Sequence, residues 1–408
     1  MGDWKAHLSR RSVLGATATL AAWSYAPRFA FAAQGRDPRL VTIILRGAMD
    51  GLSAIAPIGD PDYLALRAGL ALSAQGPNPA MPLDGFFALH PAMPHFARLY
   101  RAGQALAIHA TATPYRARSH FDGQDILESG QPRPGLTDSG WMNRVLQALP
   151  KGERIASQGG LSVGAMTPLI MRGKAPVLGW APQTLQRADE DLATRLLALY
   201  RDNDQPLADA LARGLAADRM ATRSGMNGKE ARGPAGGVEA MKQIATGAAR
   251  LMAQEDGPRV TALAFDGWDT HANEGNATGA LARLLGGLDE SLAAFETILG
   301  ARWASTIILV ITEFGRTARI NGTTGTDHGT GTVAFLVGGA VRGGRVIADW
   351  PGLRQEHLFE GRDLKPTTDL RAPIKGLLAD HLGLTPDVLR RSVFPGSDVI
   401  APMKGLIG

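Results

Sequence analysis

Cysteine is absent from the 408 residues of this chain. Its absence excludes disulfide bonds, a thiolate metal site and a cysteine nucleophile. Stability must therefore come from packing, helped by any metal that binds.

An excess of charge of one sign is also missing from most of the chain. The formal net charge is +5 at neutral pH, but residues 1–32 hold four basic residues and one acidic residue. Without that segment the net charge is +2. So small an excess gives no case for nucleic acid as a partner.

No apolar run is long enough to span a membrane. The first residues read SRRSVL at 9–14, continue in a mild apolar run at 13–23 and reach AFA at 30–32. This order is typical of a twin-arginine export signal with a small-residue cleavage site. We expect recognition by the twin-arginine export machinery, cleavage after Ala32 and release of the folded protein to the periplasm or outside. An uncleaved N-terminal anchor is the alternative.

Hydrophobic residues make up 45% of the sequence, which is enough for a sizeable core. The run at 306–311 is β-branched and does not alternate with polar residues, as in a strand covered on both faces. Strands and helices are expected to alternate, which predicts an α/β domain. We expect strands at 40–45, 105–110, 161–165, 176–179, 260–265, 306–311 and 333–337, and helices at 91–101, 120–128, 141–149, 183–215, 238–254 and 278–299.

Two segments break this alternation within a single domain expected at 33–408. Residues 60–87 are rich in proline, glycine and alanine, which predicts an irregular excursion rather than core. Residues 224–237 are rich in glycine and charge without apolar periodicity, which predicts a flexible surface loop or lid.

Polar side chains gather where four expected strands end. Ligands in α/β folds bind at that edge of the sheet. Aspartate, glutamate and histidine converging there suit Zn, Mn, Mg or Ca, and imidazole favours Zn or Mn. The clusters contain Asp50; Ser119, His120 and Asp122; Asp266, Asp269 and His271; and Glu313, Arg316, Asp327 and His328. The simpler alternative is that the three histidines form core hydrogen bonds without metal.

Several segments together resemble one family across nearly the whole chain after residue 32. They read RGAMDG at 46–51, LHP at 89–91, RSHFD at 118–122, GWDTH at 267–271, TEFGRT at 312–317 and DH at 327–328. The chain is identified by them as a member of the domain of unknown function 1501 family (DUF1501), which resembles the alkaline phosphatase and sulfatase superfamily. The resemblance implies a three-layer sandwich around a mostly parallel sheet, and a metal-dependent hydrolase of phosphate or sulfate esters.

The resemblance also implies roles for single residues. Ser119 takes the nucleophile position at a helix start, although a hydroxide activated by metal is the alternative. Arg316 would hold the substrate anion, and Arg46 and Arg118 are weaker candidates for that role. The implied ligands of one or two divalent ions, Zn or Mn first, are Asp50, Asp269, His271, Glu313, Asp327 and His328.

Two departures from the superfamily pattern matter. Phe314 stands where a histidine ligand is expected after Glu313, which puts a full two-metal centre in doubt. Ala112, two residues before Pro114, replaces the cysteine or serine of formylglycine sulfatases. The leading hypothesis is a periplasmic hydrolase with a small anionic substrate, and the alternative is a non-catalytic binding or envelope-assembly protein that keeps the fold.

Overall fold

The computed structural model describes residues 37–149, 159–164, 166–181, 190–224 and 237–408. The export signal expected at 1–32 and most of the loop expected at 224–237 lie outside these ranges. Residues 38–408 form one compact unit. None of the helices in the described ranges is both long and apolar enough to cross a membrane.

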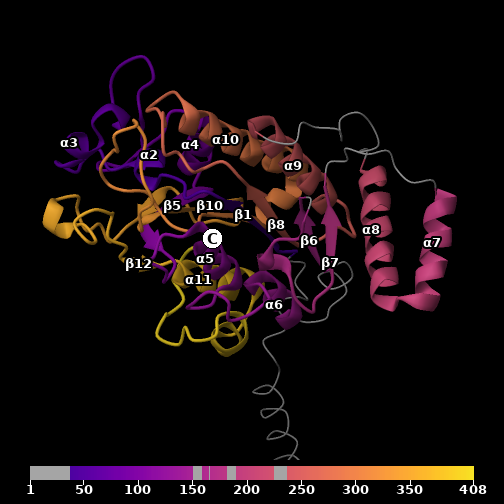
Figure 1. Cartoon of the computed structure of the whole chain (residues 1–408). Coiled ribbons are helices and arrows are strands. Elements are labelled where there is room, and N and C mark those ends of the chain that lie inside the picture. The colour runs from indigo at the N-terminus through magenta and orange to yellow at the C-terminus, as the bar shows by residue number, and fades with distance from the viewer. Residues whose placement is uncertain (1–36, 150–158, 165, 182–189, 225–236) are drawn as a thin grey trace, which may run out of the picture. The chain divides into compact units, whose positions relative to one another are not determined.

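A sheet of nine strands lies at the centre of the described chain (Figure 1). The order is β11-β5-β10-β9-β1-β8-β6-β7, and β12 also pairs with β5. Only β10 is antiparallel to its neighbours, β5 and β9, so the expected mostly parallel sheet is confirmed. The strands are β1 Arg39–Leu45, β5 Ala105–Ala112, β6 Gly160–Val163, β7 Val177–Trp180, β8 Val260–Phe265, β9 Thr306–Ile311, β10 Thr332–Val337, β11 Arg345–Ile347 and β12 Thr368–Asp369.

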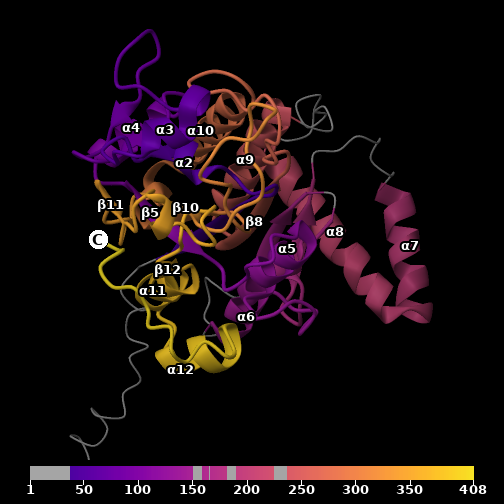
Figure 2. The same cartoon turned by 60° about the vertical axis from the view of Figure 1, so that its left-hand side comes forward.

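Strand β1 is buried on both faces, because its side chains alternate between two cores. Val41 and Ile43 enter one core, and Leu40 and Ile44 enter the other. Helices α4, α9 and α10 cover the first face, and α5, α6 and α11 cover the second (Figures 1 and 2). The expected three layers are therefore confirmed. The helices are α4 Pro94–Arg101, α5 His120–Ser129, α6 Trp141–Ala148, α9 Gly237–Met252, α10 Ala280–Leu299 and α11 Arg371–Leu382.

The helical pattern expected at 183–215 consists of two helices in the described residues, α7 Glu190–Asn203 and α8 Gln205–Arg223. The break falls at Asp204, whose carboxylate accepts a hydrogen bond from the N–H of Leu207 and so caps α8. Short elements complete the described fold: α2 Gly51–Ala54, α3 Tyr63–Arg67, α12 Pro386–Val388 and a small sheet of β2 Ile55–Ala56, β4 Ala88–Leu89 and β3 Met81–Pro82.

The expectation that residues 60–87 lie outside the core is wrong for their largest side chains. Tyr63 and Arg67 are fully buried, and Tyr63 belongs to a third apolar cluster with Leu66 and Leu72. A composition rich in proline, glycine and alanine marks an irregular backbone. It does not reveal which few large side chains that backbone turns inward.

Candidate metal centre

The loops that follow four strands meet at one edge of the sheet. Strands β1, β8 and β9 are parallel, and β5 runs in the same direction because β10 is antiparallel to both β5 and β9. Their carboxyl ends therefore share an edge. The segments beyond these ends carry the polar residues that the sequence singles out.

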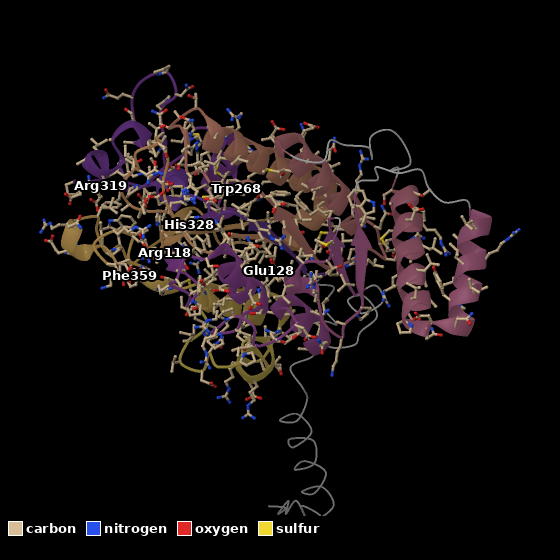
Figure 3. All side chains as sticks on the ribbon, viewed as in Figure 1. Arg118, Glu128, Trp268, Arg319, His328 and Phe359 are labelled. Carbon is tan, nitrogen blue, oxygen red and sulfur yellow. The ribbon has the colours of Figure 1, made fainter. Side chains whose placement is uncertain are left out.

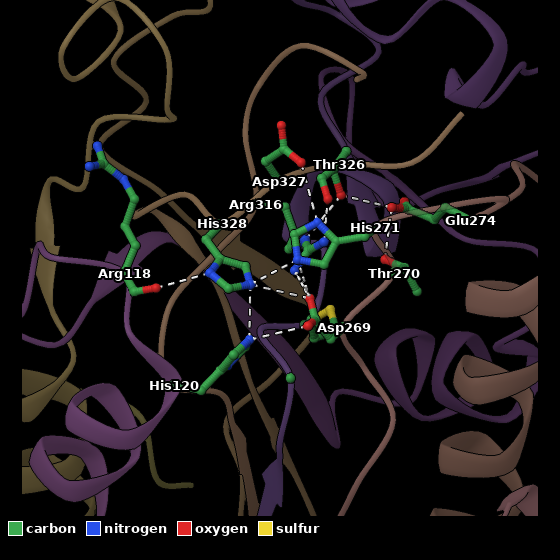
Figure 4. Close-up of polar contacts among 12 residues, drawn as sticks. Arg118, His120, Asp269, Thr270, His271, Glu274, Arg316, Thr326, Asp327 and His328 are labelled. Carbon is green, nitrogen blue, oxygen red and sulfur yellow. Dashed lines mark hydrogen bonds and ion pairs between the residues drawn. The ribbon is translucent and has the colours of Figure 1, made fainter. Parts of the chain in front are cut away.

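Three imidazoles and one carboxylate converge at this edge (Figure 4). The Nε2 atom of His328 lies 3.0 Å from the Nε2 atoms of both His120 and His271. Oδ1 of Asp269 lies 3.1 Å from Nε2 of His271 and 3.4 Å from Nε2 of His328, and its Oδ2 lies 3.4 Å from Nε2 of His120. His120, Asp269 and His328 offer ligand atoms that all lie within 4.8 Å of one another. Nitrogen and oxygen donors at this separation fit a single Zn or Mn ion.

Each imidazole is held in place by a hydrogen bond from its Nδ1 atom. The acceptors are Oε1 of Glu313 for His120 at 2.8 Å, Oδ1 of Asp327 for His271 at 3.2 Å, and the carbonyl oxygen of Arg118 for His328 at 2.9 Å. An acceptor on Nδ1 fixes the tautomer and leaves the Nε2 lone pair free for a metal. The pattern occurs at all three histidines, whose side chains are 25 to 45% exposed and so do not lie in the core.

Glu313 is buried and fully engaged by the protein. Its Oε1 accepts from the N–H of Gly47 at 2.9 Å and from Gln124 at 3.2 Å, and its Oε2 accepts from the hydroxyl of Thr312 at 2.9 Å. Burial raises the pKa of Glu313, but the hydrogen bond with His120 and the other donors hold it below its ordinary value. The same hydrogen bond raises the pKa of His120. Glu313 therefore orients the candidate ligand His120, and its position does not support its expected role as a ligand.

Two glycines allow the loops to pack this closely. Gly47 has a φ of +120°, and a Cβ atom there would lie 2.5 Å from the backbone nitrogen of Asp269. A Cβ on Gly325 would lie 2.4 Å from the carbonyl carbon of His271. Cβ atoms are not found so close to backbone, so a side chain at either position would push a loop away from the site.

Arg316 is turned toward the protein. Its side chain has no exposed surface, and it donates to Asp269, to the hydroxyl of Thr326 at 3.1 Å and to the carbonyl of Thr326. Burial raises the pKa of Asp269, yet the hydrogen bond and charge of Arg316 bring it below its ordinary value. Arg316 thus holds Asp269 in place as an anion. Its position does not support the expected role of clamping a substrate.

Asp50 lies in a separate buried group. It caps α2 by accepting from the N–H groups of Leu52 and Ser53, and it forms an ion pair with Arg67. Arg67 also donates to the hydroxyl of Ser53 at 2.7 Å and lies 3.6 Å from Glu274. Burial and the nearby Asp50 raise the pKa of Glu274 to about 8. Arg67 therefore neutralises Asp50, and the arrangement does not support Asp50 as a metal ligand.

Two neighbours of His120 complete the site. Ser119 occupies the position before α5 but makes no capping hydrogen bond with its side chain. Phe314 stacks against His120 with ring centroids 5.0 Å apart and an angle of 29° between the planes. The phenylalanine that replaces an expected histidine thus supports one imidazole from the side.

The structure brings together Asp269, His271 and His328 from the predicted set. Glu313 contacts His120 and Asp327 contacts His271, so these two carboxylates support candidate ligands. His120 is not among the ligands expected from the sequence, because the adjacent Ser119 takes the nucleophile position there. A Ser-His pair at an expected helix start is the available signal, and it does not say which of the two points inward.

The fold and the site define a mixed α/β protein with a candidate centre for a single metal at the carboxyl edge of its sheet. The chain belongs to the family described as Protein of unknown function (DUF1501), whose model matches residues 37–393. None of the curated proteins matches its sequence.

Similar solved structures include Ps i-CgsB in complex with k-i-k-neocarrahexaose, with 11% identity, coverage of 90% of this chain and 76% of that chain, and a TM-score of 0.40. Another is the phosphonate monoester hydrolase of Agrobacterium radiobacter, with 13% identity, coverage of 86% and 75%, and a TM-score of 0.30. At such TM-scores neither match carries an argument about function.

Proposed function

We propose that this protein is a metal-dependent hydrolase of phosphate or sulfate esters with one metal ion at its active centre. The observation that carries the proposal is the convergence of three Nε2 atoms on Asp269, each imidazole being held through Nδ1. His120, His271, His328 and Asp269 would hold the ion. A divalent ion in such a site supplies Lewis-acid polarisation of a phosphoryl or sulfuryl oxygen.

The remaining residues would position these groups and admit substrate. Arg316 would keep Asp269 ionised and aimed, and Glu313 would aim His120. The side chains of Asp269 and His271 are 37% and 45% exposed, so the donor set is open to solvent on their side. Ser119 remains the candidate nucleophile and water is the alternative. The signal expected at 1–32 makes the periplasm the proposed location, which N-terminal sequencing of the mature protein would test.

The test of the proposal is elemental analysis of protein purified without chelator, beside an Asp269→Ala/His328→Ala variant. We expect about one equivalent of Zn or Mn in the wild type and none in the variant. A screen of phosphate and sulfate esters then follows, with Ser119→Ala as a second variant. Loss of turnover with metal retained assigns attack to the serine. Folded protein that stays free of metal after soaking in Zn and Mn salts would refute the proposal.

A second candidate function is metal-dependent binding without catalysis. Four protein donors complete a tetrahedral Zn site, and closed sites of that kind are structural. Cobalt substitution separates the two candidates, because the visible absorption of Co²⁺ reports its coordination. A spectral change on adding phosphate or sulfate indicates an open position and favours the hydrolase. An unchanged spectrum, together with no ester turnover, favours binding alone.

A further inference from the structure

Three arginines near the metal centre already have carboxylate partners. Arg46 lies 2.6 Å from Glu128, and Arg316 is paired with Asp269. Arg118 lies 2.6 Å from Glu360 and 2.7 Å from Asp363. Figure 4 shows the guanidinium of Arg118 reaching away from the three imidazoles, while its backbone carbonyl faces His328. The charge of each of these three arginines is therefore neutralised by a carboxylate of the protein.

Arg362 differs from these arginines in its surroundings. One of its Nη atoms donates to the carbonyl oxygen of His328 at 2.7 Å, so the guanidinium lies against the segment that carries a metal ligand. Among the described residues, its carboxylate contact is with Asp363 at 3.7 Å, beyond hydrogen-bond distance, and Asp363 already accepts from Arg118. The side chain is 44% exposed. Arg362 therefore offers hydrogen-bond donors to solvent.

The backbone around Arg362 is fixed by hydrogen bonds. Its carbonyl accepts from the N–H of Ala318 at 3.1 Å, and its own N–H donates to the carbonyl of Phe359 at 3.1 Å. Asp363 forms bridges with Thr317 and Phe359, and Arg118 lies over the ring of Phe359. In Figure 3, Arg118, Phe359 and His328 lie on the same side of the described chain. The arginine is thus carried by a segment attached to the loops of the metal centre.

Arg362 also lies on the open side of the centre. Asp327, which directly precedes His328, is 51% exposed, and the side chain of His271 is 45% exposed. Arg362 donates to the carbonyl of His328, so its guanidinium is held beside this solvent-exposed part of the centre. A substrate that reaches the metal from that side comes within range of this guanidinium.

We propose that Arg362 determines the specificity of this site by binding the tetrahedral oxyanion of the substrate. The inference rests on the proposed function and narrows it to phosphate and sulfate esters that keep a negative charge, as opposed to neutral phosphate triesters and sulfate diesters. Guanidinium matches such oxygens with two parallel hydrogen bonds. The arginine makes no covalent bond and transfers no proton.

The test is calorimetric titration of metal-replete protein with inorganic phosphate and, separately, with sulfate. Arg362→Gln removes the charge and keeps a shorter polar side chain, and Arg362→Lys keeps the charge without the planar fork. We expect Arg362→Gln to weaken anion binding about 10- to 100-fold, as for loss of a charged hydrogen bond. Arg362→Lys should lie between it and the wild type. Metal content should be unchanged in both.

Arg319→Gln is the matched control. Arg319 is an exposed arginine that lies apart from His328 in Figure 3, so its loss should leave binding unchanged. Equal anion affinity in wild type and Arg362→Gln would overturn the inference, as would a wild type that binds neither anion. The proposed function fails separately, if metal-replete wild type hydrolyses no phosphate or sulfate ester. Ester turnover with a KM that Arg362→Gln does not raise would sink the inference and leave the hydrolase.

Discussion

At the scale of single residues, the structure separates the proposed metal ligands from the carboxylates that orient them. Glu313 and Asp327 are acidic residues at a strand end, as ligands are, and the sequence predicts both as ligands. In the structure each accepts from Nδ1 of a histidine instead. Residue type and spacing do not distinguish a metal ligand from a residue that supports a ligand, because both roles need a carboxylate close to the ion.

Replacing Glu313 tests this division. Glu313→Gln removes the charge that orients His120, and loss of such a supporting group costs about 10- to 100-fold in metal affinity. We expect weaker binding of Zn in competition with a coloured chelator, with the metal still bound at saturation. Asp327→Asn should cost less, because Asp327 is half-exposed and water can take over part of its role. Complete loss of metal in Glu313→Gln would instead make Glu313 a direct ligand.

Asp50 and Arg67 show why another part of the site was beyond prediction. An aspartate after the first strand is visible in the sequence, and the family resemblance assigns it to metal. The residue that neutralises it is Arg67, which sits in a segment whose composition predicts only irregular backbone. Pairing between two residues 17 positions apart depends on how that segment folds back. Sequence spacing does not encode that path.

At the scale of elements, apolar runs predict the central strands well. Strands β1, β8 and β9 fall within one residue of the expected ranges, because each run is long and buried on both faces. Strands β11 and β12 are too short to show a period. The sequence therefore predicts no strand after residue 337, although two complete the sheet.

The loop between β9 and β10 gives a prediction at this scale. Gly325→Ala places a methyl group 2.4 Å from the carbonyl carbon of His271, so the loop must move away from that ligand. We expect a clear loss of metal affinity, measured by chelator competition, with little change in far-ultraviolet circular dichroism. Gly322→Ala is the control in the same loop, since nothing lies within 4 Å of its added methyl. Equal losses in the two variants would show that the close contact does not matter.

At the scale of the whole molecule, the site joins distant parts of the chain. His120 follows β5, Asp269 and His271 follow β8, and His328 precedes β10. An ion bound by all of them holds these segments together, and it stabilises the fold in proportion to its affinity for the native state. Measuring the free energy of unfolding with and without metal therefore tests how many ions bind.

We expect one metal ion per chain, because Arg67 occupies the acidic group around Asp50. At free metal of 100 times the dissociation constant, the ion should add about 2.7 kcal/mol to the free energy of unfolding. Calorimetric melting with metal and after chelation measures the difference. A His120→Ala/Asp269→Ala variant should melt at the same temperature in both conditions. Two ions per chain would restore Asp50 as a ligand.

The position of β1 has a consequence for synthesis. This strand is the earliest in the described chain, yet its two partners are β8 and β9, more than 200 residues later. Contacts so distant in sequence are slow to form. Most of the protein must therefore be synthesised before the middle of the sheet can form. Until then the first strand has no partner, and a chain stopped before residue 306 would leave one edge of β1 open to aggregation.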